Sequence, residues 1–247
     1  MKTGNPNKPQ PAGTTYSVLN WGPCVMRIQI TDEFHQLLLK EGEASRVESQ
    51  GIQNKLAGIM KEEYSLRDKN ILMPYMAECI GVYDEARLRW SNKKPTQTPQ
   101  YNLREIWVNY MKKNEFNPPH DHSDTLSFVI YLTVPEEIKK EQEEYKGKSS
   151  GPGGISFLYG EGTRQAITYQ AIMPSEKDMW IFPAWVKHYV APFYSDVTRI
   201  SVAGTLLIVF HWLVLKKAYL FTPIKNNVRE IQRSKMGWKI KGFQRSL

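Results

Sequence analysis

A polar cluster that runs directly into an apolar strand, over residues 117–132, constrains this chain more than any other feature. The cluster contains His120, His122 and Asp124, each separated from the next by one residue. In an extended chain, side chains two residues apart leave the same face. Imidazole and carboxylate groups crowded on one face are typical ligands of a divalent metal ion. The spacing therefore predicts a metal site in which His122 is joined by His120 or by Asp124.

A second candidate segment lies downstream and contains His188, in the sequence Trp-Ile-Phe-Pro-Ala-Trp-Val-Lys-His-Tyr-Val. Arg199 and Ser201 follow it in the sequence Thr-Arg-Ile-Ser-Val. Together the two segments fit a 2-histidine-1-carboxylate or a three-histidine iron site with a basic anchor for an acidic co-substrate.

Apolar residues after the polar cluster continue the parity of the candidate ligands. We expect them to form an apolar floor behind the metal, where they would limit the access of water. These residues are Leu126, Phe128, Ile130 and Leu132.

The composition fits one generous domain or two small ones, with 247 residues of which 41% are hydrophobic. Thirteen Tyr and seven Trp favour a β-rich fold. Cys24 and Cys79 lie far apart and form no metal or disulfide pattern, so we expect them to be reduced. The N-terminus lacks the apolar core of a signal peptide, and a cytoplasmic location is expected.

The net charge of +8 is concentrated at the C-terminal end of the chain. Residues 211–247 carry nine Lys or Arg and a single acid, Glu230, so the rest of the chain is balanced. A basic tail can bind nucleic acid, although a solvated extension explains the same charges.

Periodicity and turn residues divide the chain into a helical or mixed N-terminal part and a β-rich part. Thr31 to Glu33 starts one expected helix, residues 52–66 have helical spacing, and Pro74 opens a helix that ends near Trp90. A charged helix is expected within 135–148. Strands are expected at 15–30, with a break at Gly22-Pro23, and at 105–111, 125–134, 155–159, 166–172, 178–182, 187–192 and 198–210.

These patterns predict four regions. They are a loose arm (1–14), a helical or mixed support region (15–102), a β core (103–210) and a basic tail (211–247). Residues 205–221 are very apolar, but His211, Lys216 and Lys217 interrupt them. Because a membrane helix needs about 20 apolar residues, we expect a closing strand and a packed segment instead.

The ordered motifs resemble the iron(II)/2-oxoglutarate-dependent dioxygenases, whose core is a double-stranded β-helix like that of the cupins. That family carries His-x-Asp/Glu, a distal His and a basic residue about ten positions later, often as Arg-x-Ser. Here the pattern reads His122-x-Asp124 or His120-x-His122, then His188 and Arg199-Ile-Ser201. The phrase around His188 is similar to the oxygenase branch that includes phage-encoded proteins of the prolyl-hydroxylase type. The resemblance covers about residues 104–206.

The resemblance implies a fold, cofactors and residue roles. The fold would be mostly β with flanking helices around a jelly-roll core. Fe(II) would be held by His120, His122 and His188, with Asp124 as the alternate to His120. Arg199 and Ser201 would bind the far carboxylate of 2-oxoglutarate, and O2 would be the oxidant. Tyr110 is expected to reach the co-substrate, whereas Tyr131 has the opposite parity to His122 and is the weaker candidate.

Three functions are therefore considered. The first is a dioxygenase that hydroxylates a peptide, a protein or a small molecule, in the host cytoplasm if the chain is phage-encoded. The second is a cupin-like protein that binds a metal or a sugar without turnover. The third is a structural protein that associates with nucleic acid through the basic tail. His35 and His211 are expected to be structural histidines.

Overall fold

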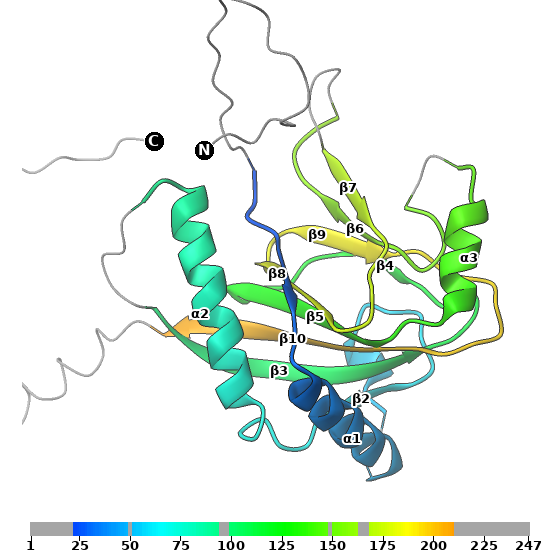
Figure 1. Ribbon diagram of the computed structural model, residues 1–247, viewed down its shortest axis with the longest axis horizontal. Coiled ribbons are helices and arrows are strands. Elements are labelled where there is room, and N and C mark those ends of the chain that lie inside the picture. Colours follow the sequence, from blue (N-terminus) through cyan, green and yellow to red (C-terminus); the bar gives the residue numbers. More distant parts are fainter. Residues whose placement is uncertain (1–21, 49–50, 94–98, 148–149, 163–167, 210–247) are drawn as a thin grey trace, which may run out of the picture. The chain divides into compact units, whose positions relative to one another are not determined.

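Two antiparallel sheets face each other in the computed structural model (Figure 1). The larger sheet has six strands in the order β1-β8-β5-β10-β3-β2, and the smaller sheet has four in the order β4-β9-β6-β7. The structure describes residues 22–48, 51–93, 99–147, 150–162 and 168–209. The expected mostly β class is confirmed.

The chain crosses repeatedly between the two sheets from β3 onward, as it does in a double-stranded β-helix. The larger sheet comprises β1 (Met26–Gln29), β2 (Glu63–Ser65), β3 (Gln100–Met111), β5 (Leu126–Thr133), β8 (Asp178–Pro183) and β10 (Arg199–Val209). The smaller sheet comprises β4 (Asn117–His120), β6 (Ile155–Leu158), β7 (Tyr169–Ile172) and β9 (Lys187–Val190). Strands β1 and β2 come from the expected support region, yet they pair into the same sheet as the core strands.

Helices α1 (Asp32–Glu48) and α2 (Met73–Trp90) cover one face of the larger sheet (Figure 1). The hydroxyl of Thr31 accepts a hydrogen bond from the Phe34 N–H at 3.2 Å, which satisfies a free donor at the start of α1. Pro74 lies in the first turn of α2, as expected. The charged segment forms α3 (Glu136–Glu144), which also confirms the prediction.

The main hydrophobic core lies between α1, α2 and the larger sheet. Phe34 and Leu38 of α1 pack with Met76 of α2 and with apolar residues of the sheet. The opposite face of the larger sheet looks toward the smaller sheet, where Phe157 packs against Phe182. Each strand of the larger sheet therefore has one face toward the helices and one toward the space between the sheets.

The residues expected to form an apolar floor behind the metal lie on the face of the larger sheet that packs against the helices. Leu126, Phe128, Ile130 and Leu132 belong to the core beneath the helices. The chain bends at residues 123–125, between the histidines and β5. His120 and Leu126 also belong to different sheets, so a count of alternating residues cannot be carried from one to the other.

Residues 52–66 form no long helix. They contain a short 3-10 helix, η1 (Gln53–Lys55), and the edge strand β2. Met60 and Leu66 are buried from loop positions on either side of β2, whereas Ile59 is exposed, so the apolar residues of this segment do not share one helical face.

Several expectations concern residues outside the described part of the chain. The arm at 1–14, the basic tail at 211–247 with His211, and most of the apolar run at 205–221 lie there. Residues 205–209 are the end of β10, as expected for a closing strand. Among the described residues, no helix combines the length and apolar character needed to span a bilayer.

Candidate metal centre

His120 and His188 come from neighbouring strands of the smaller sheet. His120 ends β4 and is paired directly with His188 of β9. The centroids of the two rings lie 4.3 Å apart. A single pairing across an antiparallel ladder therefore places two imidazoles side by side.

His122 completes the cluster from the segment that follows β4. Its N–H donates to the carbonyl of Ala184 in the β8–β9 turn at 2.9 Å. Its ring centroid lies 5.1 Å from that of His120 and 5.3 Å from that of His188. One nitrogen from each of the three rings lies within 4.8 Å of the others, a separation at which all can bind one ion.

Backbone carbonyls orient two of the rings. Nδ1 of His120 lies 2.8 Å from the carbonyl oxygen of Pro118, and Nδ1 of His188 lies 3.0 Å from that of Val186. When Nδ1–H donates to a carbonyl, Nε2 keeps its lone pair for a metal. These contacts therefore leave Nε2 of His120 and His188 available to a metal.

The protonation of the cluster also favours metal binding. Burial, together with the neighbouring His120, lowers the pKa of His122 to about 4. The same two causes lower the pKa of His188 to about 3. Both rings are therefore neutral at physiological pH, as metal ligation requires.

Asp124 lies outside the group of three histidines. It is close enough to raise the pKa of His122 slightly against the larger effect of burial. The structure thus brings together His120, His122 and His188, and it leaves Asp124 as a nearby charge.

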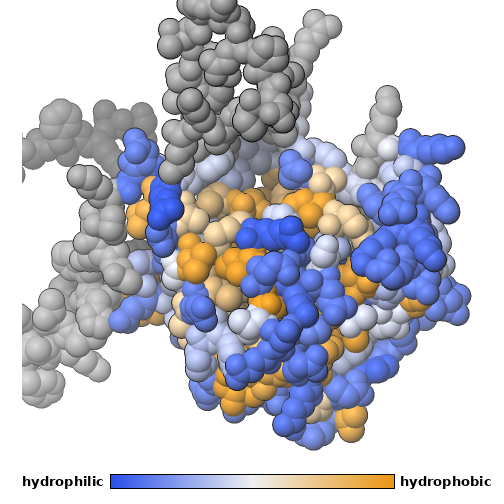
Figure 2. Space-filling view, viewed as in Figure 1, coloured by the Kyte–Doolittle hydropathy of each residue, from blue (hydrophilic) through white to orange (hydrophobic). Residues whose placement is uncertain are grey.

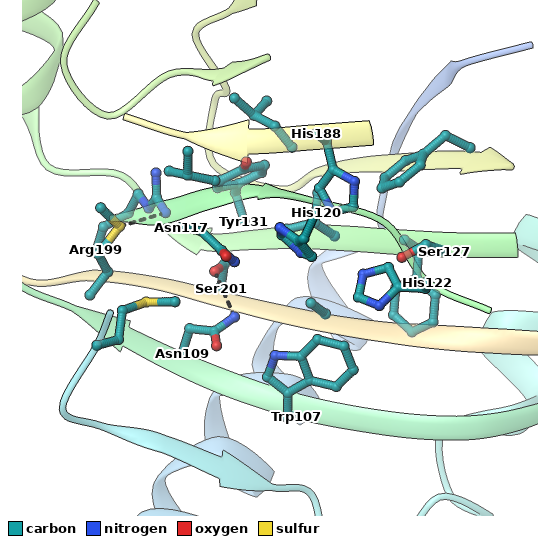
Figure 3. A pocket seen from close by; sticks show the side chains of 18 residues that line it. Trp107, Asn109, Asn117, His120, His122, Ser127, Tyr131, His188, Arg199 and Ser201 are labelled. Atoms are coloured by element: carbon teal, nitrogen blue, oxygen red, sulfur yellow. Dashed lines mark hydrogen bonds between the residues drawn. The ribbon is translucent and has the colours of Figure 1, made fainter. Parts of the chain in front are cut away.

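A pocket that is partly open to solvent lies between the two sheets, and its lining includes the three histidines and Arg199. In Figure 3 the histidines and Arg199 lie at separate places in this pocket, with Tyr131, Asn117 and Ser201 between them. Trp107 contributes a wall, and its ring centroid lies 6.1 Å from that of His122.

Arg199 is a buried cation without an anionic partner among the described residues. Its side chain is only 3% exposed. One terminal nitrogen donates to the carbonyl of Gly153 at 2.7 Å, the other approaches Met111 Sδ at 2.9 Å, and Nε has no partner. Burial lowers the pKa of Arg199, although Tyr131 opposes the effect. A buried charge without a partner destabilises the folded protein, so an anionic ligand that pairs with Arg199 would be stabilising.

Ser201 and Tyr131 lie beside Arg199. Ser201 is paired with Tyr131 across β10 and β5 and with Asn109 across β10 and β3. The guanidinium carbon of Arg199 lies 5.4 Å from the centroid of the Tyr131 ring. The Tyr131 hydroxyl is fully buried and has no hydrogen-bond partner in the part of the chain that the structure describes, and burial raises its pKa to about 12. It is therefore a protonated donor, free to bind a ligand.

Tyr110 does not join this group. Its ring belongs to the core under the helices, and its hydroxyl donates to Glu43 of α1 at 3.4 Å. The guanidinium of Arg46 lies over the same ring at 4.6 Å. Odd-numbered residues of β3 line the pocket, so the even position of Tyr110 turns it away.

Sequence reasoning undervalued Tyr131 and did not name three further residues of the pocket, Trp107, Asn109 and Asn117. A signal was present in β5. Residues 126, 128, 130 and 132 are uniformly apolar, whereas Ser127 and Tyr131 carry hydroxyls. A strand with one apolar face and one mixed face turns the mixed face toward a site, so Tyr131 could have been placed there.

The described cysteines and His35 agree with their expected roles. Cys24 and Cys79 are free thiols. His35 is buried, and its Nε2 lies 2.7 Å from the carbonyl oxygen of Leu132, which is a structural contact.

Comparisons with known proteins agree with this geometry. Residues 105–204 match the model of a family described as putative 2OG-Fe(II) oxygenase. No curated protein matches the chain.

Solved structures share a low sequence identity with this chain. A prolyl-4-hydroxylase from Pseudomonas putida is 12% identical, with 75% of this chain and 93% of that chain covered and a TM-score of 0.47. A prolyl hydroxylase from Trichoplax adhaerens, in complex with a peptide of hypoxia inducible factor, is 12% identical, with 82% and 88% covered and a TM-score of 0.47. The carbocyclase SnoK from nogalamycin biosynthesis is 13% identical, with 74% and 79% covered and a TM-score of 0.49.

The matched segment contains the three histidines, Arg199 and Ser201. Over residues 105–204, the chain is similar to the family of putative 2OG-Fe(II) oxygenases.

Proposed function

We propose that His120, His122 and His188 hold the Fe(II) of a 2-oxoglutarate-dependent dioxygenase. The convergence of one ring nitrogen from each of the three histidines within 4.8 Å supports this assignment. Carbonyl contacts at Nδ1 of His120 and His188 orient the rings for ligation through Nε2. Asp124, the alternate ligand, would remain outside the coordination sphere.

Arg199, Ser201 and Tyr131 would bind the far carboxylate of 2-oxoglutarate. The guanidinium can form charge-assisted bonds with that carboxylate, and the two hydroxyls can donate to it. The observation that carries the proposal is the pairing, in one pocket, of a histidine cluster with a buried guanidinium that lacks an anion. A dicarboxylic acid could bind the metal with one end and pair with the guanidinium of Arg199 through the other.

Fe(II) supplies the activation of O2, which is coupled to the decarboxylation of 2-oxoglutarate. In the balanced reaction, 2-oxoglutarate, O2 and a substrate C–H bond give succinate, CO2 and a hydroxylated product. The protein's part is to bind, orient and exclude water. Phe182, whose ring lies 4.8 Å from that of His188, and Phe157 form the apolar wall beside the metal site.

The substrate would be a peptide, a protein or a small molecule that reaches the open side of the pocket. We assign catalysis to the core at 103–210 and support to the region at 15–102, from which Met60 reaches the pocket wall. The family match favours an enzyme over a cupin-like binding protein without turnover. The same match favours an enzyme over a structural protein that associates with nucleic acid through its basic tail.

The test is the formation of succinate from 2-oxoglutarate with and without Fe(II). Wild-type protein should form succinate only with Fe(II), and His188→Ala should form none. Tyr189→Phe is the matched control, because Tyr189 is paired with Ser156 on the outer face of the smaller sheet. Equal turnover by wild type and His188→Ala would overturn the proposal.

A further inference from the structure

Helix α3 lies against the two backbone segments that surround Arg199. One segment, residues 150–154, supplies the Gly153 carbonyl that accepts from Arg199. The other, residues 191–198, leads directly into Arg199 at the start of β10. Neither segment is a strand, so the position of the guanidinium depends on what holds them.

Glu141 of α3 holds the second segment. Its carboxylate accepts from the N–H of Tyr194 at 2.9 Å and from the N–H of Ser195 at 2.6 Å. The Ser195 hydroxyl donates to the same carboxylate. Three donors on one carboxylate fix the segment four residues before Arg199.

Gln142 and Ile138 hold the first segment. The Gln142 amide donates to the carbonyl of Ser150 at 3.0 Å. Ile138 is fully buried and packs with Phe193 and with Met111, the residue whose sulfur faces Arg199. At Gly153, where φ is +68°, a Cβ would lie 2.4 Å from Ile138 Cγ2, so the helix and this segment are in close contact.

The rest of α3 is solvated. Its sequence is charged or amide-bearing at every position except Ile138. Figure 2 shows hydrophilic residues over the part of the surface where Figure 1 places α3. The helix therefore contributes to the protein mainly through the few residues that touch the two segments.

We propose that α3 fixes the position of Arg199, with Glu141 as a positioning residue that sets the affinity for the dicarboxylate co-substrate. This inference rests on the proposed function of Arg199. Glu141 does not touch the pocket, so it would act only through residues 194–198. Burial would raise the pKa of Glu141, but the bonds from Ser195 and Tyr194 outweigh it and lower that pKa. The carboxylate is thus ionised and accepts all three bonds at physiological pH.

The experiment measures 2-oxoglutarate and Fe(II) binding separately, without O2, in the full chain. Glu141→Ala should raise the dissociation constant of 2-oxoglutarate about tenfold, the scale on which loss of supporting hydrogen bonds is felt at a ligand site. Fe(II) affinity should be unchanged, because the hydrogen bonds that hold the three histidines go to Pro118, Ala184 and Val186 and not to α3. Glu141→Gln, which keeps an acceptor oxygen, should recover part of the affinity.

Glu144→Gln is the control, since Glu144 is exposed on the same helix and its side chain forms no hydrogen bond or ion pair within the described residues. It should bind both ligands as wild type does. In turnover, Glu141→Ala should raise the KM for 2-oxoglutarate and leave kcat at saturation within about twofold of wild type.

Three outcomes would overturn the inference. Wild-type protein that binds Fe(II) but no 2-oxoglutarate would overturn it together with the proposed function. Binding of 2-oxoglutarate by wild type and Glu141→Ala with equal affinity would overturn the role of α3 alone. Equal loss of Fe(II) and 2-oxoglutarate affinity in Glu141→Ala would show a general structural role instead.

Discussion

His120 and His188 are directly opposed residues of two antiparallel strands, with ring centroids 4.3 Å apart. Their separation is set by the spacing of the strands, and neither depends on a long flexible loop. The turn after β8 holds His122 and His188 through its backbone. The carbonyl of Ala184 accepts a hydrogen bond from the His122 N–H, and the carbonyl of Val186 accepts one from Nδ1 of His188. The β8–β9 turn thus contributes to the position of two of the three rings.

Replacement of His120 and of Asp124 separates the two possible ligand sets. His120→Ala should abolish tight Fe(II) binding, because it removes one of the three converging nitrogens. Asp124→Asn should retain it, since Asp124 is not part of the cluster. The measurement is Fe(II) bound per chain after anaerobic desalting. Retention by His120→Ala with loss in Asp124→Asn would favour the carboxylate set.

Replacement of Arg199 should separate binding from stability. Arg199→Met removes a buried, uncompensated charge, so the ligand-free protein should melt at the same temperature as wild type or higher. The variant should bind 2-oxoglutarate about 100-fold more weakly or worse, because a buried charge pair is lost. Melting curves and anaerobic titration measure the two effects. Arg104→Met, at an exposed position of β3, is the control.

The two tyrosines should differ in their effect on the co-substrate. Tyr131→Phe removes a hydroxyl without a partner in the pocket, so 2-oxoglutarate binding should weaken by about 1 kcal/mol. Tyr110→Phe removes a hydroxyl that faces Glu43, on the other side of the sheet, and should leave binding unchanged. Equal dissociation constants for wild type and Tyr131→Phe would place the carboxylate elsewhere.

Glu63 gives the stability of the protein a specific pH dependence. This side chain is 1% exposed and lies opposite Asn109 in the ladder of β2 and β3. Burial, with a smaller effect from Glu115, raises its pKa from 4.5 to about 7. The folded state therefore holds this proton more tightly than the unfolded state does. The stability that Glu63 contributes is complete below pH 4.5 and is lost as the pH rises to about 7.

Denaturant unfolding of wild type and Glu63→Gln between those pH values measures this contribution. The free energy of unfolding of wild type should fall relative to that of the variant as the pH rises. A difference that stays constant over the range would mean that Glu63 is ionised throughout.

The sequence was a good guide wherever a local pattern decides the structure. Pro74 marked the start of α2, and the charges around residues 136–144 marked α3. The candidate ligands were recognisable because His120 and His122 precede a strand and His188 lies beside an apolar wall. These patterns depend on neighbours in the sequence and need no tertiary information.

The errors come from long-range pairing. Residues 52–66 have helical spacing because Leu56, Met60 and Tyr64 are four residues apart, yet Tyr64 pairs with Val108 in a sheet. Tyr131 was the weaker candidate because its parity was counted from His122 through the bend at 123–125. A count of alternating residues identifies the residues that share a face, but the packing of α1 and α2 decides which face is buried beneath them.

The most direct test is an anaerobic titration of the protein with Fe(II) and then with 2-oxoglutarate, followed by visible absorption. A visible charge-transfer band should appear only when both are present. It should be absent in His188→Ala and should require far more 2-oxoglutarate in Arg199→Met. A full-intensity band in His188→Ala, or none in wild type at saturating concentrations, would contradict a site in which the histidines and Arg199 hold one co-substrate between them.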